Sequence, residues 1–509
     1  MFARRNPWPL LLILVAFYGA VFAGYRFWRE SVRVVTLSAG KKAYLHYELV
    51  DVALSTRDSE VTARWRQNPP VVTVTHDGSE VTTVAGLRRL PLREDGAAWR
   101  GLWPVPWNAE PGEYRLSLSS ADALGDRLQA SGFRIERRKP APIPKGLSIL
   151  TLESVTPLAE MKVKAPDGTE KDWRGLLDWA QYVGADAFWM LGGQTPGKNP
   201  GEVWVTTNLD MIPKVAHECH ARGLKFGVYA MCYLTMSTRT VGGYEYARDV
   251  QEGASLPTRA ISLRDPRRPR DVSALLAKFA ASPDVDYVGL DYIRNALGGY
   301  ELADEFFAEM PGVSPPPDWT RLSEEQRMVW FARKKIMRRD MAFIDAWQWW
   351  RAHKVGQIVN GIKARVGARK PLWAFTLTWD KGWNHGQDPV MMNDAGVDVD
   401  ALMLYEATKE QYDALVGDWH RYVHRGDVQL VVGDVIDWPL HQRDPAGPGE
   451  FYRRETKAVD EIYADGPAAG VFFHDAARAL WGRVGPWGTR GWMDAAKRAT
   501  EYVKSRPSS

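Results

Sequence analysis

Eight short apolar runs, each followed by a longer segment, dominate the sequence from residue 147 onward. The runs are LSILTLES (147–154), ADAFWML (185–191), LKFGVYAMCY (224–233), YVGLDYIR (287–294), PLWAFTLTW (371–379), DALMLYEAT (400–408), VQLVVGDVI (428–436) and AAGVFFHDA (468–476). Most of the intervening segments have the periodicity of amphipathic helices. Eight strands alternating with helices predict an α/β fold, a closed (β/α)8 or TIM barrel, over residues 147–509.

A different pattern precedes the predicted barrel. Between residues 35 and 138, short runs that alternate polar and apolar residues are broken by turn residues, as in VVTVTH and GEYRLSLSSA. This pattern predicts a small all-β sandwich domain. Pro140, Pro142 and Pro144 cannot continue a sheet, so residues 139–146 are predicted to form a stiff, extended linker.

Residues 1–34 are predicted to be a targeting segment and a short linker. Arg4 and Arg5 precede an apolar run from Trp8 to about Ala23. The run is short for a membrane span of ~17–25 residues and long for a signal-peptide core of ~7–15 residues. We expect an uncleaved single-pass signal anchor, and a cleaved signal peptide with a secreted product is the alternative. Positive charge before the run would keep the N-terminus in the cytoplasm and place the rest of the chain in the periplasm or outside the cell.

Composition narrows the possible partners and cofactors. The 66 basic and 62 acidic residues give a net charge of +4 without any basic run, so no nucleic-acid partner is expected. Cys219 and Cys232 are too few for a disulfide framework and have no zinc-binding spacing, so we predict no metal site. No nucleotide or other cofactor motif is present. The 23 Trp and 19 Tyr are typical either of sugar-stacking clefts or simply of an aromatic core.

Polar residues at the C-terminal ends of barrel strands are the candidate catalytic residues. Asp291 is followed by Arg294, and a carboxylate kept ionised by this arginine would suit a nucleophile or an oxocarbenium stabiliser. Glu406 follows Tyr405, and burial near aromatic rings would raise its pKa enough for a proton donor. We therefore predict Asp291 and Glu406 as the catalytic pair. A salt bridge for Asp291 and a helix cap for Glu406 are the alternatives.

The other strand ends supply candidates for substrate binding. They are Glu153, Tyr229, Tyr292, Arg294, Trp379, Asp380, His385, Tyr405, Asp434, Trp438 and His474. Tyr229, Trp379 and Trp438 are the predicted stacking platforms. His474 precedes an aspartate but no GxSxG motif accompanies it, so it is predicted to contact a sugar hydroxyl or a loop.

The strand that contains Asp291 resembles one in a known group of barrels. DYVGLDYIR is similar to the DGI-LDYIR strand of glycosyl-hydrolase-like barrels, distant relatives of the α-amylase and α-galactosidase barrels. FIDAWQWWRAHKVGQIVNGIKARV resembles their W-x-x-W-R helix before strand five, and LKFGVYA resembles their strand three. This resemblance covers the chain from Gly146 onward. Residues 99–135 separately resemble bacterial immunoglobulin-like modules.

The resemblance implies a glycoside hydrolase. By position, Asp291 matches the strand-four aspartate that such barrels use as nucleophile or stabiliser, and Arg294 matches the arginine that follows it. Barrels of the α-galactosidase kind place the acid/base after strand six, which favours Glu406. Amylase-like barrels place a glutamate after strand five, where this chain has Asp380 instead. Asp380 and Asp434 therefore stay open as the second carboxylate.

These observations predict an extracytoplasmic glycoside hydrolase that acts on a cell-envelope or exported polysaccharide. Carboxyl groups ~5–5.5 Å apart would give retention of configuration, and ~6.5–9.5 Å would give inversion. The alternative is a catalytically inactive glycan-binding or scaffold protein of a polysaccharide export or envelope system, in which only one carboxylate would be functional. A polysaccharide deacetylase is disfavoured because it needs a metal site, and no compact His/Asp cluster stands out.

Overall fold

The computed structural model describes most of the chain from residue 8 to residue 506. The gaps in this description are 120–123, 125–126, 197–200, 206, 237–240, 242, 296–297, 338, 368–369, 378–383, 406–407, 424–427, 437–446 and 464–468. The chain divides into two compact units. The first comprises Met1–Tyr44, Glu48–Glu136 and Glu309–Ser314, and the second comprises Leu45–Tyr47, Arg137–Ala308 and Pro315–Ser509.

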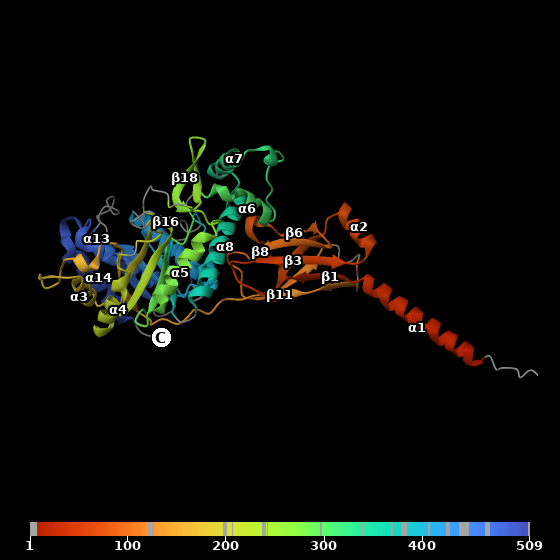
Figure 1. Cartoon of the computed structure of the whole chain (residues 1–509), viewed down its shortest axis with the longest axis horizontal. Coiled ribbons are helices and arrows are strands. Elements are labelled where there is room, and N and C mark those ends of the chain that lie inside the picture. The colour runs from red at the N-terminus through yellow and green to blue at the C-terminus, as the bar shows by residue number, and fades with distance from the viewer. Residues whose placement is uncertain are drawn as a thin grey trace, which may run out of the picture. The chain divides into compact units, whose positions relative to one another are not determined.

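The predicted targeting segment lies in helix α1 (Trp8–Val32), drawn in red in Figure 1. Several of its apolar side chains are exposed, among them Leu12, Phe17 and Phe22. Within the part of the chain that the structure describes, no helix has both the length and the hydropathy needed to cross a membrane. The predicted signal anchor stays a prediction.

The first unit contains two β-sheets. The first sheet has the strand order β10 (Leu128–Ala130), β1 (Val35–Ala39), β3 (Leu49–Thr56), β8 (Ala98–Pro104) and β7 (Arg93–Asp95). The second sheet has the strand order β2 (Ala43–Tyr44), β11 (Gly132–Ile135), β9 (Gly112–Leu118), β4 (Val71–His76) and β5 (Ser79–Glu80), and β6 (Arg89–Pro91) also pairs with β4. Alternate residues of both sheets, such as Val52 and Val74, are buried in one shared hydrophobic core. A helix, α2 (Ser59–Gln67), follows β3, and its N-terminus is capped by Asp58. The unit is thus a β-sandwich, and its likeness to immunoglobulin-like modules stays a prediction.

The second unit is a closed barrel of eight parallel strands. They are β12 (Leu147–Leu152), β15 (Ala187–Thr195), β16 (Lys225–Thr235), β19 (Tyr287–Asp291), β20 (Leu372–Leu377), β21 (Val399–Met403), β22 (Leu430–Val435) and β23 (Gly470–His474). Each strand pairs with the next in chain order, and β23 pairs with β12 to close the barrel. All eight predicted strands are confirmed, and so is the TIM barrel.

Helices surround the strands (Figure 1). They are α3 (Arg174–Tyr182), α4 (Ile212–Ala221), α5 (Arg267–Ala281), α8 (Met341–Val366), α10 (Pro389–Ala395), α11 (Lys409–Val423), α12 (Pro448–Ile462), α13 (Ala476–Trp481) and α14 (Gly488–Ser505). After β16 the chain forms a hairpin of β17 (Tyr246–Gln251) and β18 (Ala254–Ile261), and after β19 it adds α6 (Ala303–Glu309) and α7 (Glu324–Ile336). Both additions follow the C-terminal end of a strand, the end at which barrel enzymes place their sites.

Two tryptophan rings fill part of the barrel interior, and two glycines on neighbouring strands leave the space for them. Trp189 and Trp373 stack with their ring centroids 3.8 Å apart, and both are fully buried. A Cβ on Gly227 would lie 2.2 Å from Trp189, and one on Gly289 would lie 2.2 Å from Trp373. Glycine is therefore required on these neighbouring strands, because any side chain there would displace an indole ring.

We predict that Trp373→Ala will lower the stability of the barrel by about 3–5 kcal/mol, the usual loss for a buried aromatic residue. The substitution removes the ring stacked on Trp189 and leaves a cavity that the rigid strands cannot close. Thermal denaturation followed by circular dichroism will measure the change. Trp481→Ala is the matched control, because Trp481 is 49% exposed and its loss should change stability by less than about 0.5 kcal/mol. Equal melting temperatures for the two variants would contradict the packing described above.

Candidate active site at the barrel mouth

Four strands carry a polar side chain at their last inward position. Alternate residues of a barrel strand face inward, and the core formed by these positions includes Ile149, Tyr287, Met403 and Phe472. The same inward face includes Glu153, four residues after Ile149, and Asp291, four residues after Tyr287. It also includes Tyr405, two residues after Met403, and His474, two residues after Phe472. These four residues therefore lie at the C-terminal mouth of the barrel. Of the four, Asp291 was a predicted catalytic residue and the other three were predicted substrate contacts.

Glu153 and His474 form an ion pair at this mouth. His474 Nε2 lies 3.3 Å from Glu153 Oε2, and the two side chains are 5% and 22% exposed. Burial by itself lowers the pKa of His474, but the hydrogen bond and the charge of Glu153 outweigh this effect and leave the pKa raised. Burial likewise opposes ionisation of Glu153, yet its pKa is lowered by the contact with His474. The pair is thus a carboxylate and an imidazolium.

Thr151 accepts a hydrogen bond from the second ring nitrogen of His474, Nδ1. Its hydroxyl donates to the carbonyl of Phe473 at 3.1 Å, which leaves the oxygen free to accept from His474 Nδ1 at 3.2 Å. Both ring nitrogens of His474 then act as donors, as in the charged form of histidine. Sequence reasoning missed this role of Thr151, although its position two residues before Glu153 places it on the same inward face.

Asp475 and Arg478 support the pair from helix α13. Asp475 accepts the backbone N–H of Glu153 and, at 3.0 Å, that of Arg478 at the start of the helix. Burial raises the pKa of Asp475, and the charge of Arg478 helps to lower the pKa of Glu153. The backbone of Glu153 is therefore fixed by a helix cap.

The pKa of Asp291 is shifted in the opposite direction from that of Glu153. Asp291 is 3% exposed, and burial together with the charge of Glu153 raises its pKa to about 7, against the weaker effects of Arg294 and His474. Its Oδ1 accepts the backbone N–H of Tyr292 at 2.7 Å. The prediction that Arg294 would keep Asp291 ionised is corrected, because desolvation exceeds the attraction between the two charges. The mouth thus holds one ionised carboxylate and one that retains its proton close to neutral pH.

Tyr292 and Arg294 follow Asp291 in the chain, and His385 lies beside the next residue, Asn295. Tyr292 has a positive φ of 48°, and the guanidinium of Arg294 lies over its ring at 4.4 Å. His385 Nδ1 lies 2.9 Å from the backbone carbonyl of Asn295 and must donate to it. Burial, with the nearby charge of Arg294, lowers the pKa of His385 to about 3, so its ring is neutral and its Nε2 is an acceptor. The structure therefore brings Tyr292 and Arg294 close to Asp291, and His385 close to Arg294 and Asn295.

Tyr405 completes the ring of polar groups. Its ring stacks on that of His474, with the centroids 5.7 Å apart. Burial raises the pKa of Tyr405 far above its usual value, so its hydroxyl remains protonated. A neutral phenol beside an imidazolium and a carboxylate is suited to hydrogen bonds with sugar hydroxyls.

Tyr229, a predicted stacking platform, belongs instead to the barrel core. It has no exposed surface, and its ring packs edge-on against Trp373 and Phe375. Strand β16 continues to Thr235, so Tyr229 lies below the mouth and not at its edge. Its hydroxyl donates to the carbonyl of Leu152 at 3.3 Å. The prediction that Tyr229 stacks on a sugar was therefore wrong.

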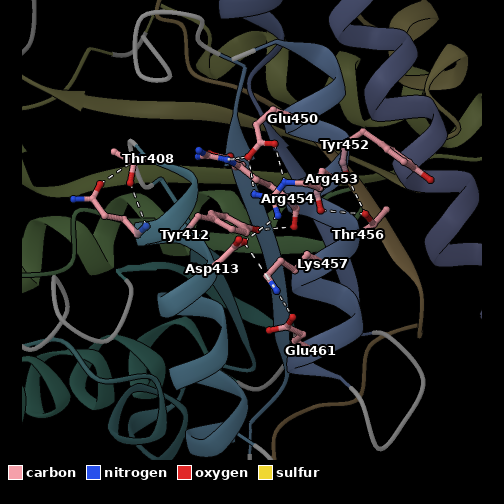
Figure 2. Close-up of polar contacts among 12 residues, drawn as sticks. Thr408, Tyr412, Asp413, Glu450, Tyr452, Arg453, Arg454, Thr456, Lys457 and Glu461 are labelled. Atoms are coloured by element: carbon pink, nitrogen blue, oxygen red, sulfur yellow. Dashed lines mark hydrogen bonds and ion pairs between the residues drawn. The ribbon is translucent and has the colours of Figure 1, made fainter. Parts of the chain in front are cut away.

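Asp434, considered above as a second carboxylate, faces the helices outside the barrel. Its Oδ2 lies 3.5 Å from Arg454 Nη1 of α12, and its backbone N–H donates to Glu455 at 2.9 Å. Figure 2 shows the polar contacts around Arg454 between α11 and α12, including the Tyr412 hydroxyl that donates to its carbonyl at 2.6 Å. Asp434 is fully buried there. It joins strand to helix and cannot contact a ligand in the mouth.

Four predicted site residues lie outside the described part of the chain. They are Glu406, Trp379, Asp380 and Trp438. Their predicted roles stay predictions. Among the described residues, no group of three or more His, Cys, Asp or Glu side chains could hold a metal ion.

A scan of known protein families and a search of curated proteins both found no match to this sequence. Among solved structures, the chain is similar to a pullulanase from Paenibacillus barengoltzii (11% identity, 92% of this chain and 81% of that chain, TM-score 0.38). It is also similar to a β-galactosidase from Marinomonas ef1 (12%, 70% and 59%, 0.45) and an α-amylase from Geobacillus thermoleovorans (12%, 70% and 79%, 0.38). All three are glycoside hydrolases.

We predict that Asp291→Asn will stabilise the protein progressively as the pH rises from about 4.5 to about 8. Because the folded-state pKa of about 7 exceeds the unfolded value near 3.8, folding retains a proton that the unfolded chain releases, and wild-type stability falls with pH across this window. The asparagine side chain has no proton to lose and can still accept from Tyr292. Melting temperatures of both proteins across the window will measure the difference. A constant difference at all pH values would exclude a raised pKa for Asp291.

Proposed function

We propose that the barrel hydrolyses glycosidic bonds with Glu153 and Asp291 as its pair of carboxyl groups. One observation carries this proposal: the two groups share the barrel mouth, and their surroundings shift their pKa values in opposite directions. Glycoside hydrolysis requires such a pair, with one carboxyl group ionised and the other protonated. Glu153 thus takes the place of Glu406 in the predicted pair, and Asp291 becomes the acid.

The proposed roles follow from the contacts of each group. Asp291 keeps its proton near neutral pH and donates it to the oxygen of the leaving sugar. Glu153 is held ionised by His474, so it either attacks the anomeric carbon or removes a proton from the attacking water. The neutral ring of His385 and the hydroxyl of Tyr405 bind sugar hydroxyls. His474 acts as a positioning residue, because it fixes the charge and the orientation of Glu153.

We further propose that the enzyme acts outside the cytoplasm on a cell-envelope or exported polysaccharide. Arg4 and Arg5 before the apolar start of α1 support export. The sandwich unit between this segment and the barrel is proposed to space the catalytic unit from the cell surface.

Replacing either carboxyl group should abolish turnover. We expect Asp291→Asn and Glu153→Gln each to lower kcat by about 10²–10⁴-fold on the polysaccharide that the wild type cleaves, which is the usual loss for a proton-transferring group. The assay is release of new reducing ends from a panel of bacterial envelope and exported polysaccharides. Asp77→Asn and Glu501→Gln are the matched controls, since their side chains are 91% and 63% exposed.

A second readout separates catalysis from mere structural damage. If Asp291 is the acid, wild-type kcat/KM must fall as the pH rises through about 7, where Asp291 loses its proton. The falling limb should be absent from the residual activity of Asp291→Asn. Wild-type turnover that both variants retain would refute the pair. Binding without turnover would favour the glycan-binding alternative.

Export is tested by fusing alkaline phosphatase after residue 34 and, separately, after residue 506. We expect both fusions to be active, because this reporter folds only where disulfides form, outside the cytoplasm. Replacing Arg4 and Arg5 by glutamate is expected to reduce reporter activity. Active cytosolic protein without reporter activity would refute the proposed location.

A further inference from the structure

Arg294 is a cation at the barrel mouth without an acidic partner among the described residues. Its guanidinium lies 4.4 Å above the ring of Tyr292, and its charge acts on Asp291, Tyr405 and His385. Its Nη1 is buried and has no hydrogen-bond partner within the described chain. Burial lowers the pKa of Arg294, so the charge is held in an unfavourable environment. Stacking on an aromatic ring orients the guanidinium but does not neutralise it.

The two nearby carboxyl groups do not compensate this charge. Glu153 is paired with His474 at 3.3 Å, and the pKa of Asp291, about 7, keeps that group substantially protonated near neutral pH. His385 is neutral and adds no negative charge. A buried or half-buried arginine is normally paired with an anion, because the cost of removing a charge from water is otherwise not offset.

Asn295, the residue after Arg294, also has buried polar atoms without a hydrogen-bond partner in the described part of the chain. Asn295 is 2% exposed, and neither Oδ1 nor Nδ2 of its side chain has a hydrogen-bond partner among the described residues. Buried polar side-chain atoms in folded proteins nearly always have such partners. Two consecutive residues beside Asp291 therefore have polar groups that this chain does not satisfy.

We propose that the sugar unit bound beside Asp291 carries a carboxylate and that Arg294 recognises it. The planar guanidinium matches a carboxylate with two parallel hydrogen bonds. The substrate would then be an acidic polysaccharide built from uronic acid units. This inference rests on the proposed function, because it assigns the substrate class of the same site. A sulfate ester has related chemistry, so the test separates the two.

The test compares polygalacturonate, alginate and hyaluronan with the neutral polymers obtained by reducing their carboxyl groups, with dextran sulfate as an additional arm. Cleavage and binding are measured on the full chain. We expect the wild type to prefer at least one native polymer over its reduced form by about tenfold or more in kcat/KM or Kd. Arg294→Gln should remove this preference, and Arg294→Lys should retain part of it. Arg365→Gln is the matched control, because it removes an exposed arginine in the last turn of α8.

The outcomes separate this inference from the proposed function. Equal cleavage of a native polymer and its reduced form overturns the inference but supports the proposed hydrolase function. Cleavage of none of the polymers counts against the hydrolase, and binding then decides the inference. A preference for the native form that Arg294→Gln removes supports it, while equal binding or no binding of both forms overturns it. Tighter binding of dextran sulfate than of every uronate polymer also overturns it, in favour of a sulfate ester. Melting temperatures will check that each variant is folded.

Discussion

Closure of the parallel sheet is the constraint on which the rest of the barrel depends. Because β23 pairs with β12, each of the eight barrel strands has a partner on both sides, and every second residue of each strand must enter a narrow interior. The stacked Trp189 and Trp373 fit only because Gly227 and Gly289 face them from neighbouring strands. The same closure brings the last inward residue of each strand to one rim, where side chains far apart in sequence share a poorly hydrated space.

Removal of water at this rim acts on all its ionisable groups, and the partner of each group decides the result. Glu153 has His474 in direct contact, and this contact outweighs the cost of burial. Among the described residues, the carboxyl group of Asp291 accepts a hydrogen bond from one backbone N–H and has no ion pair with Arg294, so burial dominates and its pKa rises to about 7. The charge on Glu153 adds to the rise. The two carboxyl groups are therefore differentiated by geometry and not by residue type.

The sequence located the strands correctly but placed two side chains wrongly, for different physical reasons. Tyr229 lies on the inward face as expected, but β16 extends six residues further, so Tyr229 lies within a core layer. Asp434 lies near the end of its strand, but Val431, an inward-facing residue three positions earlier on that strand, sets a phase that turns Asp434 toward Arg454. Strand length and phase depend on packing around the whole barrel, and a local pattern of apolar residues does not specify either.

The sequence by itself determined the barrel, the preceding sandwich and the presence of polar residues at the strand ends, because apolar periodicity and turn residues are local properties of a chain. It also identified Asp291, Glu153 and His474 as residues of one rim. Only the tertiary structure decided that Glu153 is ionised and that Asp291 keeps its proton. Thr151 and His474 are separated by 323 positions in the chain, and their contact exists only after the barrel closes. A pKa is set by distances and burial in space, so it could not be read from the order of the residues.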